Sequence, residues 1–421
     1  MIKPELLVPA GNQEKLEVAA AYGADAVYFG GRDFSLRARA GNFSLAELPA
    51  AIAFCREKGI KAYLAVNLLA GNADFPPLAE FLDALRPQPP DALIVADPGV
   101  LTLCRELLPA TPLHLSTQAN SLNYRTAAFW RRQGVSRINL ARELSLAEMA
   151  EIVRRVPDLE CEVFVHGAMC MAYSGRCLLS AALSGRSANR GDCAQPCRWS
   201  YALVEETRPG EYLTLEEDQR GSYIFNSRDL CLLARLPELV AAGISSCKIE
   251  GRMKSAYYVA VVTRVYRRAL DRLAAAGGFS AAELAAWKKE LTRVSHRRYT
   301  EAFIDGGRPQ AEDPVQYPAD SAYLRNSQFV ALVSRVLAYD PVTDCSEVEL
   351  QVKARLAAGA EIEVITPEMD DFTTTIVELK QIQGEKTALA HPGTEARARC
   401  RGRLKALQIL RRPLAGRESG D

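Results

Sequence analysis

Four of the eleven cysteines lie close together, in a stretch without helical or strand-like periodicity. They are Cys170, Cys177, Cys193 and Cys197, with the spacing C-x6-C-x15-C-x3-C. Four thiolates can hold a tetrahedral zinc ion or an iron–sulfur cluster. Structural zinc sites prefer pairs separated by two to four residues, and the first pair here is wider. The spacing therefore fits structural zinc less well, and an iron–sulfur cluster, zinc and a metal-free structural role are the alternatives.

The other seven cysteines are better explained without a metal. The odd total argues against a disulfide framework. Cys231 could replace one cluster ligand, but it falls within a pattern that predicts a helix and is better explained as core. The remaining six are expected to be small buried hydrophobic side chains: Cys55, Cys104, Cys161, Cys247, Cys345 and Cys400.

The composition is that of a folded protein with more than one domain. At 421 residues the chain exceeds a typical domain, and its 48% apolar and 24% charged residues disfavour disorder, collagen and coiled coil. With 52 basic and 51 acidic residues, any nucleic-acid site must be a local patch. We find neither an apolar run long enough to cross a membrane nor a signal peptide, and therefore expect a cytoplasmic protein.

Residues 1–305 contain β-type apolar runs that alternate with segments of helical period. Eight predicted strands cover 5–8, 26–30, 61–68, 92–97, 113–118, 137–141, 161–166 and 246–250. Predicted helices include 13–22, 45–58, 76–85, 124–133, 146–156 and 227–242. This pattern predicts an α/β fold, a TIM-like (β/α) barrel with reactive groups at the C-terminal strand ends. An open doubly wound sheet is the alternative, but no Gly-x-Gly-x-x-Gly follows the first strand.

Two further regions follow from breaks in this pattern. Residues 167–226 carry the clustered cysteines and form a Cys-rich insertion, which we expect at the C-terminal face of the barrel. Residues 306–325, rich in Gly, Pro and Asp, are a predicted linker. Beyond it, alternating runs predict a small antiparallel β-barrel over 326–413 and a tail over 414–421. Its predicted strands are 329–338, 346–353, 361–366, 372–380, 386–390 and 402–409.

Polar residues at the predicted strand ends should converge at the mouth of the first barrel. They are Asn67, Gln118, Asn120, Arg142, Glu143, His166, Lys248, Glu250 and Arg252. Among them, Glu250 could act as a general acid or base, or form an internal salt bridge with Lys248 or Arg252.

A basic run near the C-terminus is the best local patch for RNA. Five cations alternate with other residues, so on one strand they would share a face: Arg397, Arg399, Arg401, Arg403 and Lys405. The alternative is a charged edge strand that discourages aggregation. Phosphate contacts and a stacking ring could also come from residues that flank the cysteines: Arg186, Arg190, Arg198 and Trp199.

The segment from Glu162 to Cys170 (EVFVHGAMC), followed by Met171 to Ser180 (MAYSGRCLLS), resembles the signature of the collagenase-like peptidase family U32. The resemblance extends over essentially the whole chain. Further matching segments are 5–11, 26–31, 226–230 and 248–258. The chain length, with one C-terminal β-domain, is similar to the branch implicated in tRNA hydroxylation.

The resemblance implies a [4Fe-4S] cluster on the four cysteines, tRNA as partner, and formation of 5-hydroxyuridine at the wobble position. Other branches are implicated in hydroxylating a ribosomal RNA cytidine or ubiquinone precursors. In the RNA-modifying branches it also implies prephenate, whose two carboxylates suit arginine. The predicted prephenate-binding residues are Arg142, Arg252, Lys248 and Arg37, with Arg39 as a further candidate and surface ion pairs as their competing role. The predicted catalytic residues are Glu250, His166, Gln118 and Asn67.

Two other function classes remain open. A peptidase would need an activated nucleophile or metal-bound water, and the chain has no Gly-x-Ser-x-Gly, no zincin motif and only four histidines. A pair formed by Cys170 and His166 is conceivable. The third class is a non-catalytic RNA-binding scaffold with structural zinc.

Overall fold

The computed structural model describes residues 3–35, 41–169, 177, 179–184, 186, 188–190, 192–196, 228–306 and 324–414. Within these ranges, no helix combines the length and apolar character that crossing a bilayer requires.

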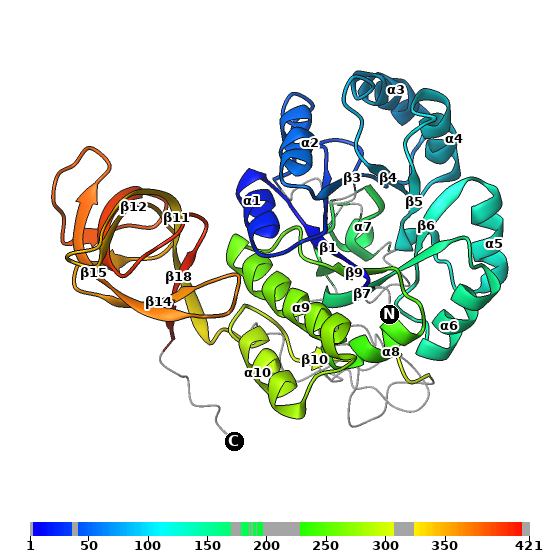
Figure 1. Ribbon diagram of the computed structural model, residues 1–421. Helices are drawn as coiled ribbons and strands as arrows, with labels where there is room; N and C mark the ends of the chain where they lie inside the picture. The colour runs from blue at the N-terminus through cyan, green and yellow to red at the C-terminus, as the bar shows by residue number, and fades with distance from the viewer. Residues whose placement is uncertain are drawn as a thin grey trace, which may run out of the picture.

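A closed barrel of parallel strands forms the larger part of the molecule (Figure 1). Its strands are β1 (Glu5–Pro9), β2 (Ala26–Gly30), β3 (Lys61–Val66), β4 (Ala92–Val95), β5 (Leu113–Leu115), β6 (Val135–Asn139), β7 (Glu160–Ala168) and β9 (Ser246–Ile249). Strand β9 pairs with both β1 and β7 and so closes the ring. The TIM-like prediction is therefore confirmed.

Helices surround these strands and cover their outer faces (Figure 1). They are α1 (Gln13–Ala21), α2 (Leu48–Glu57), α3 (Phe75–Ala84), α4 (Pro98–Leu107), α5 (Tyr124–Arg132), α6 (Leu146–Arg155), α8 (Leu236–Ala241), α9 (Ala256–Ala276) and α10 (Ala281–Leu291). Several begin at a side chain that accepts a backbone N–H, as Asn12 does for α1 and Ser145 for α6. Because both faces of the sheet are covered, strands such as β2 and β4 are buried along their whole length.

The predicted helix at 227–242 is wrong in its first half. Residues Asp229–Cys231 form a short strand, β8, which pairs antiparallel with β7 and parallel with β10 (Tyr299–Thr300). Helix α8 begins only at Leu236, with a proline in its first turn. Pairing on both sides of β8 overrides the apolar pattern that suggested a helix.

The C-terminal region forms a second closed barrel, which is antiparallel as predicted. In spatial order its strands are β11 (Ser327–Asp340), β12 (Cys345–Val352), β17 (Glu395–Arg401), β15 (Phe372–Gln381), β14 (Glu361–Ile365) and β18 (Ile409–Pro413). A small pair, β13 (Leu356–Ala357) and β16 (Leu389–Ala390), lies beside it. The predicted strand 402–409 is wrong, because positive φ angles at Gly402 and Leu407 break the extended backbone between β17 and β18.

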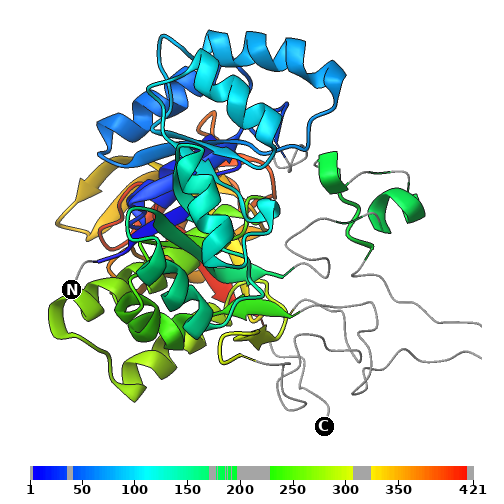
Figure 2. The ribbon, with the colours of Figure 1, turned by 90° about the vertical axis from the view of Figure 1, so that its right-hand side faces the viewer.

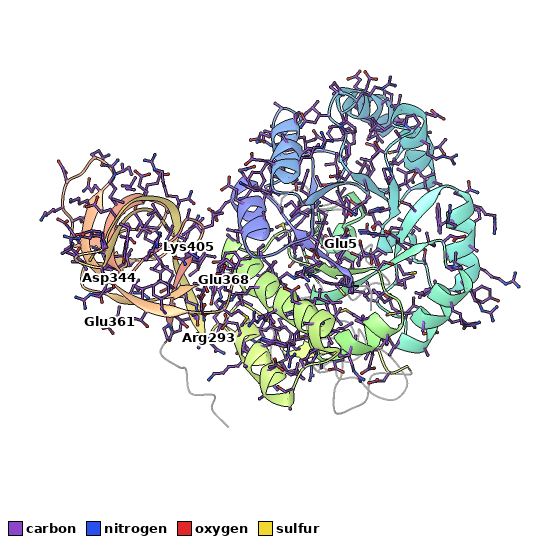
Figure 3. The ribbon with its side chains drawn as sticks, viewed as in Figure 1. Glu5, Arg293, Asp344, Glu361, Glu368 and Lys405 are labelled. Atoms are coloured by element: carbon purple, nitrogen blue, oxygen red, sulfur yellow. The ribbon has the colours of Figure 1, made fainter. Side chains whose placement is uncertain are left out.

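The two barrels share a buried network of ion pairs. Arg264 of α9 pairs with Asp371 at 2.6 Å and with Glu290 of α10. Arg411 of β18 pairs with the same Glu290 and with Glu363 at 3.0 Å, and both arginine side chains are buried. Arg293 adds a 2.8 Å contact to Glu363 and lies where the second barrel meets α10 (Figure 3). The barrels are thus joined by charges whose separation would leave buried ions unpaired.

Candidate functional site

The cysteine loop is described in part. Cys177 and Cys193 are half-buried free thiols, whereas Cys170 and Cys197 lie outside the described residues. The Sγ of Cys193 accepts a hydrogen bond from the backbone N–H of Gln195 at 3.3 Å, and the N–H of Cys177 donates to Asn189 at 3.1 Å. Backbone N–H groups stabilise a charged sulfur and are a lever by which proteins tune iron–sulfur clusters. The surroundings of the Cys193 sulfur therefore fit the thiolate role predicted for it.

The other seven cysteines differ from these two. All are buried, and burial raises the pKa of five of the thiols to about 12: Cys55, Cys104, Cys161, Cys247 and Cys400. Burial also raises the pKa of Cys231, whose Sγ lies 3.9 Å from the hydroxyl of Tyr266 in the core. Their expected role as small core side chains is confirmed. Among the described cysteines, the loop residues Cys177 and Cys193 are therefore the better candidates for a thiolate.

The described pieces of the loop lie beyond the carboxyl ends of the barrel strands. Helix α7 (Leu179–Ser184) is seen behind the ring of strands in Figure 1 and stands clear of the barrel in Figure 2. Arg186 folds back on the loop, pairing with Asp192 at 3.0 Å and donating to the carbonyl of Cys193. Of the other candidates beside the cysteines, the side chain of Arg190 and all of Arg198 and Trp199 lie outside the described part of the chain.

Asn67 and Gln118 meet at the mouth of the first barrel. The side-chain amide of Asn67 donates to Oε1 of Gln118 at 2.8 Å, and Ser116 donates to the same oxygen at 2.8 Å. The ends of β3 and β5 thus present a joined pair of amides, as the strand-end argument predicted. Asn120, in the left-handed region at φ 54°, follows directly.

Arg252 lies at the same end of the barrel, against β2. It is 3% exposed, and its Nη2 lies 3.3 Å from the hydroxyl of Ser35. Gly30 permits this packing, because a Cβ there would come within 2.7 Å of the guanidinium. Lys15, which sequence reasoning missed, donates to the carbonyl of Arg252 at 3.0 Å; burial and the charge of Arg252 lower its pKa. Arg37 and Arg39 lie outside the described residues.

Arg142 and Lys248 both lie near the ring of Phe164. The guanidinium of Arg142 lies 4.2 Å from the ring centroid and donates to the carbonyl of Ala168 at 2.9 Å. Lys248 lies 5.4 Å from the same ring but is buried, and its Nζ pairs with Glu162 at 2.7 Å. The internal salt bridge considered for Glu250 named Lys248 as a possible partner, but Lys248 pairs with Glu162 instead.

Glu162 and Asn139 were missed by sequence reasoning. The amide of Asn139 donates to the carboxylate of Glu162 at 3.0 Å, and both residues are 3% exposed. The only signal was an acidic residue inside an apolar strand.

At the mouth, Glu250 is held through its backbone: its N–H donates to the carbonyl of His166 at 2.8 Å, and Tyr258 donates to its carbonyl at 2.9 Å.

His166 does not face the barrel mouth, which corrects its assignment as a catalytic residue. A register shift between Phe164 and His166 turns its side chain outward, where Tyr266 of α9 lies 3.4 Å from Nδ1. The ring packs against Tyr258, Tyr266 and Tyr299, and burial lowers its pKa to about 3. Neutral His166 is a core side chain, and Cys170 lies outside the described residues.

The basic run divides into two parts. Arg397, Arg399 and Arg401 lie on the outer face of β17, while Ala396, Ala398 and Cys400 point into the barrel. The strand ends there, so Arg403 and Lys405 do not share its face; the guanidinium of Arg403 instead lies 5.4 Å from the ring centroid of Tyr339. Figure 3 shows Lys405 on the side toward the first barrel and Asp344 on the far side.

Acidic neighbours also reduce the charge of this patch. Arg397 pairs with Glu349 at 3.3 Å, and Arg399 lies 3.8 Å from Asp340. Strand β17 is paired on both sides, with β12 and β15, so the alternative of a protective edge strand is wrong. Of the three outward arginines, Arg401 is exposed, whereas Arg397 and Arg399 are partly exposed and lie beside carboxylates.

Comparison with known proteins agrees with this architecture. The model of "Peptidase family U32" matches residues 11–314, and that of its C-terminal domain matches residues 325–411. "tRNA hydroxylation protein P1" of Bacillus subtilis is 39% identical over 93% of this chain and 90% of its own length. "tRNA hydroxylation protein P" of Escherichia coli is 38% identical over 93% and 92%. A "Collagenase" of Porphyromonas gingivalis is 34% identical over 72% and 74%. The chain belongs to peptidase family U32.

Proposed function

We propose that this chain is an RNA-modifying enzyme that hydroxylates the wobble uridine of tRNA to 5-hydroxyuridine. The observation that carries the proposal is its similarity to two tRNA hydroxylation proteins, each matched over 93% of this chain and at least 90% of its own length. That similarity includes the second barrel as well as the first. With tRNA as substrate, we place the enzyme in the cytoplasm.

Hydroxylating a pyrimidine carbon is redox chemistry that ordinary side chains cannot perform. We propose that Cys170, Cys177, Cys193 and Cys197 hold a [4Fe-4S] cluster, which would supply electron transfer. Two observations support this assignment: Cys193 already accepts a backbone N–H, and α7 of the same loop stands over the carboxyl ends of the strands (Figure 2).

We further propose that prephenate binds at the mouth, beside the loop. Arg252 and Arg142 lie at the ends of β9 and β6 and carry the guanidinium groups that suit its carboxylates, and Arg37 remains a predicted ligand. Lys248 would act through Glu162, by holding that carboxylate in place. The joined amides of Asn67 and Gln118, together with Glu250, remain the predicted polar groups next to the reacting atoms.

For RNA, we propose that the outer face of β17 contacts phosphates through Arg397, Arg399 and Arg401. Arg403 and Lys405 would extend this contact along the segment that follows the strand.

Mass spectrometry of tRNA from a deletion strain tests the activity. Strains without other hydroxylases, complemented with the wild-type gene, should recover 5-hydroxyuridine or its derivatives, and strains complemented with Cys193→Ser should not. If neither the wild-type gene nor the Cys193→Ser gene restored the modified uridine, the proposed function would be overturned. If both genes restored it, the role of Cys193 would be overturned. Anaerobic purification with iron, sulfide and zinc analysis separates a cluster from the zinc scaffold.

A peptidase is the second candidate, because the matched relatives include a collagenase. Purified protein should then cleave denatured collagen, and Cys170→Ala should abolish cleavage. The buried, neutral His166 argues against a cysteine–histidine pair in the described structure.

A further inference from the structure

The cysteine loop begins and ends at two strands that lie side by side. Residues 169–228 connect β7 to β8, and these strands pair antiparallel, with Ala168 opposite Asp229. Strand β10 pairs on the other side of β8, with Tyr299 opposite Asp229. The loop therefore leaves the barrel wall through a three-stranded stem formed by β7, β8 and β10.

A buried ion pair lies at the point where the loop returns to this stem. Arg297 donates from Nη2 and Nε to Oδ1 of Asp229 at 2.7 and 3.0 Å, and its backbone N–H donates to Oδ2 at 3.1 Å. Asp229 is 2% exposed and Arg297 is 4% exposed. Burial by itself would raise the pKa of Asp229. The charge and hydrogen bonds of Arg297 outweigh that effect, so the net pKa is lowered and the carboxylate is ionised. Such a pair is costly to bury, and removing one partner would leave the other as an uncompensated buried charge.

Aromatic packing and a close backbone contact also hold the rest of the stem in place. His166 of β7 lies 5.2 Å from the ring of Tyr299, which stacks on His296 at 4.7 Å. Gly167, at φ 110°, lets β7 pass the end of β9, because a Cβ there would lie 2.4 Å from the carbonyl oxygen of Glu250. The stem is therefore tied both to the ion pair and to the barrel wall.

We propose that Asp229 and Arg297 are positioning residues for the cysteine loop: they clamp its stem so that its thiolates converge on one cluster. The inference rests on the proposed function in assuming that the loop holds iron. A long loop has many conformations, and fixing its two ends removes a large part of that freedom before any metal binds. Neither residue touches the cluster in this proposal.

The test compares Asp229→Asn with the double variant Asp229→Asn and Arg297→Gln, which leaves no uncompensated buried charge. A matched control is Glu290→Gln, which disturbs the buried ion pairs of Arg264 and Arg411 at the interface of the barrels. Anaerobically purified proteins are exposed to an iron chelator. We expect both stem variants to lose iron about tenfold faster than wild type, the scale on which residues that hold metal ligands in place act. The control should lose iron at the wild-type rate.

A second readout does not depend on iron. In metal-free protein we expect faster hydrogen exchange in both stem variants at the stem amide of Leu232, which donates to Val165, and at the loop amides of Ala194 and Gln195. Folded variants with wild-type iron loss and wild-type loop exchange would overturn the clamp. So would equally fast iron loss in the control, which would point to global destabilisation. If wild-type protein held no iron, the cluster assignment would fail, while loop exchange would still decide whether the clamp exists.

Discussion

The two barrels of this chain are both closed, but they are filled in different ways. The second barrel packs an apolar interior from alternate residues of its strands, such as Val348, Leu350 and Leu379. In the first barrel, apolar side chains from β1 to β4 fill one part of the interior. The other part holds charged and polar groups from β5, β6, β7 and β9: His114, Arg137, Asn139, Glu162 and Lys248.

This difference separates a barrel organised for chemistry from one organised for support. Buried ion pairs contribute little net stability, and barrel interiors are usually filled by branched aliphatic side chains. The polar part of the first barrel includes β7, the strand from which the cysteine loop departs. In the second barrel, the arginines of β17 lie on the outside and Arg411 lies at the shared interface. The buried charges of the first barrel extend from Glu5 and Arg137, near the amino ends of the strands, to Glu162 and Lys248 in β7 and β9.

The largest effect should come from removing one charge from the interior of the first barrel. Glu162→Ala leaves the ammonium of Lys248 buried without its partner, so we expect the free energy of unfolding to fall by about 3–5 kcal/mol. Chemical denaturation measures this loss. Glu162→Gln is the control, because it keeps a hydrogen-bond acceptor for Lys248 and Asn139 and should lose less. A loss in Glu162→Ala no greater than at an exposed site would show that the polar interior is not tightly packed.

A cavity in the second barrel should affect stability alone. Leu350→Ala removes a buried side chain, and we expect a loss of about 3 kcal/mol in the free energy of unfolding. Iron content and hydroxylation, measured well below the unfolding temperature, should match wild type. Reduced iron in this folded variant would contradict the division of roles between the barrels.

The buried histidines of the first barrel should make stability depend on pH. Burial lowers the pKa of His166 to about 3, whereas the unfolded chain titrates near the ordinary value of 6.5. Below pH 6.5 this histidine is protonated in the unfolded state but stays neutral in the folded state. The free energy of unfolding therefore falls as the pH falls, until the pH reaches the pKa of the folded state. His166 alone should account for about 2 kcal/mol between about pH 6.5 and about pH 5.

Replacing this histidine isolates its share of the pH dependence. His166→Phe should reduce the number of protons taken up on unfolding by about one in this window, as measured by denaturation at several pH values. An unchanged pH dependence would mean that His166 is not buried in its neutral form.

The smallest effect is expected on the outer face of β17. Arg401→Ala should weaken tRNA binding slightly and reduce the slope of log K against log salt by about one, because one phosphate contact is lost. The matched control is Arg335→Ala, whose side chain pairs with Glu349 at 3.0 Å and should leave the slope unchanged. Equal slopes in both variants would remove β17 from the RNA interface.

Local pattern was enough to find most elements and not enough to orient their side chains. Strands such as β2 and β4 were predicted because every residue in them is apolar, which reflects burial on both faces. Strand β8 was missed because its three residues are held by partners distant in sequence. His166 was misplaced because a register shift in β7 reverses the alternation on which the prediction depended.

The spacing of the cysteines, the barrel strands and the resemblance to family U32 could be derived from the sequence alone, because each depends on residues close together in the chain. The partner of Lys248, the burial of Arg252 against Gly30 and the ion pair between Asp229 and Arg297 were decided only by the tertiary structure. Each joins segments tens to hundreds of residues apart, and which buried charge meets which depends on strand order and register. No local periodicity encodes that choice.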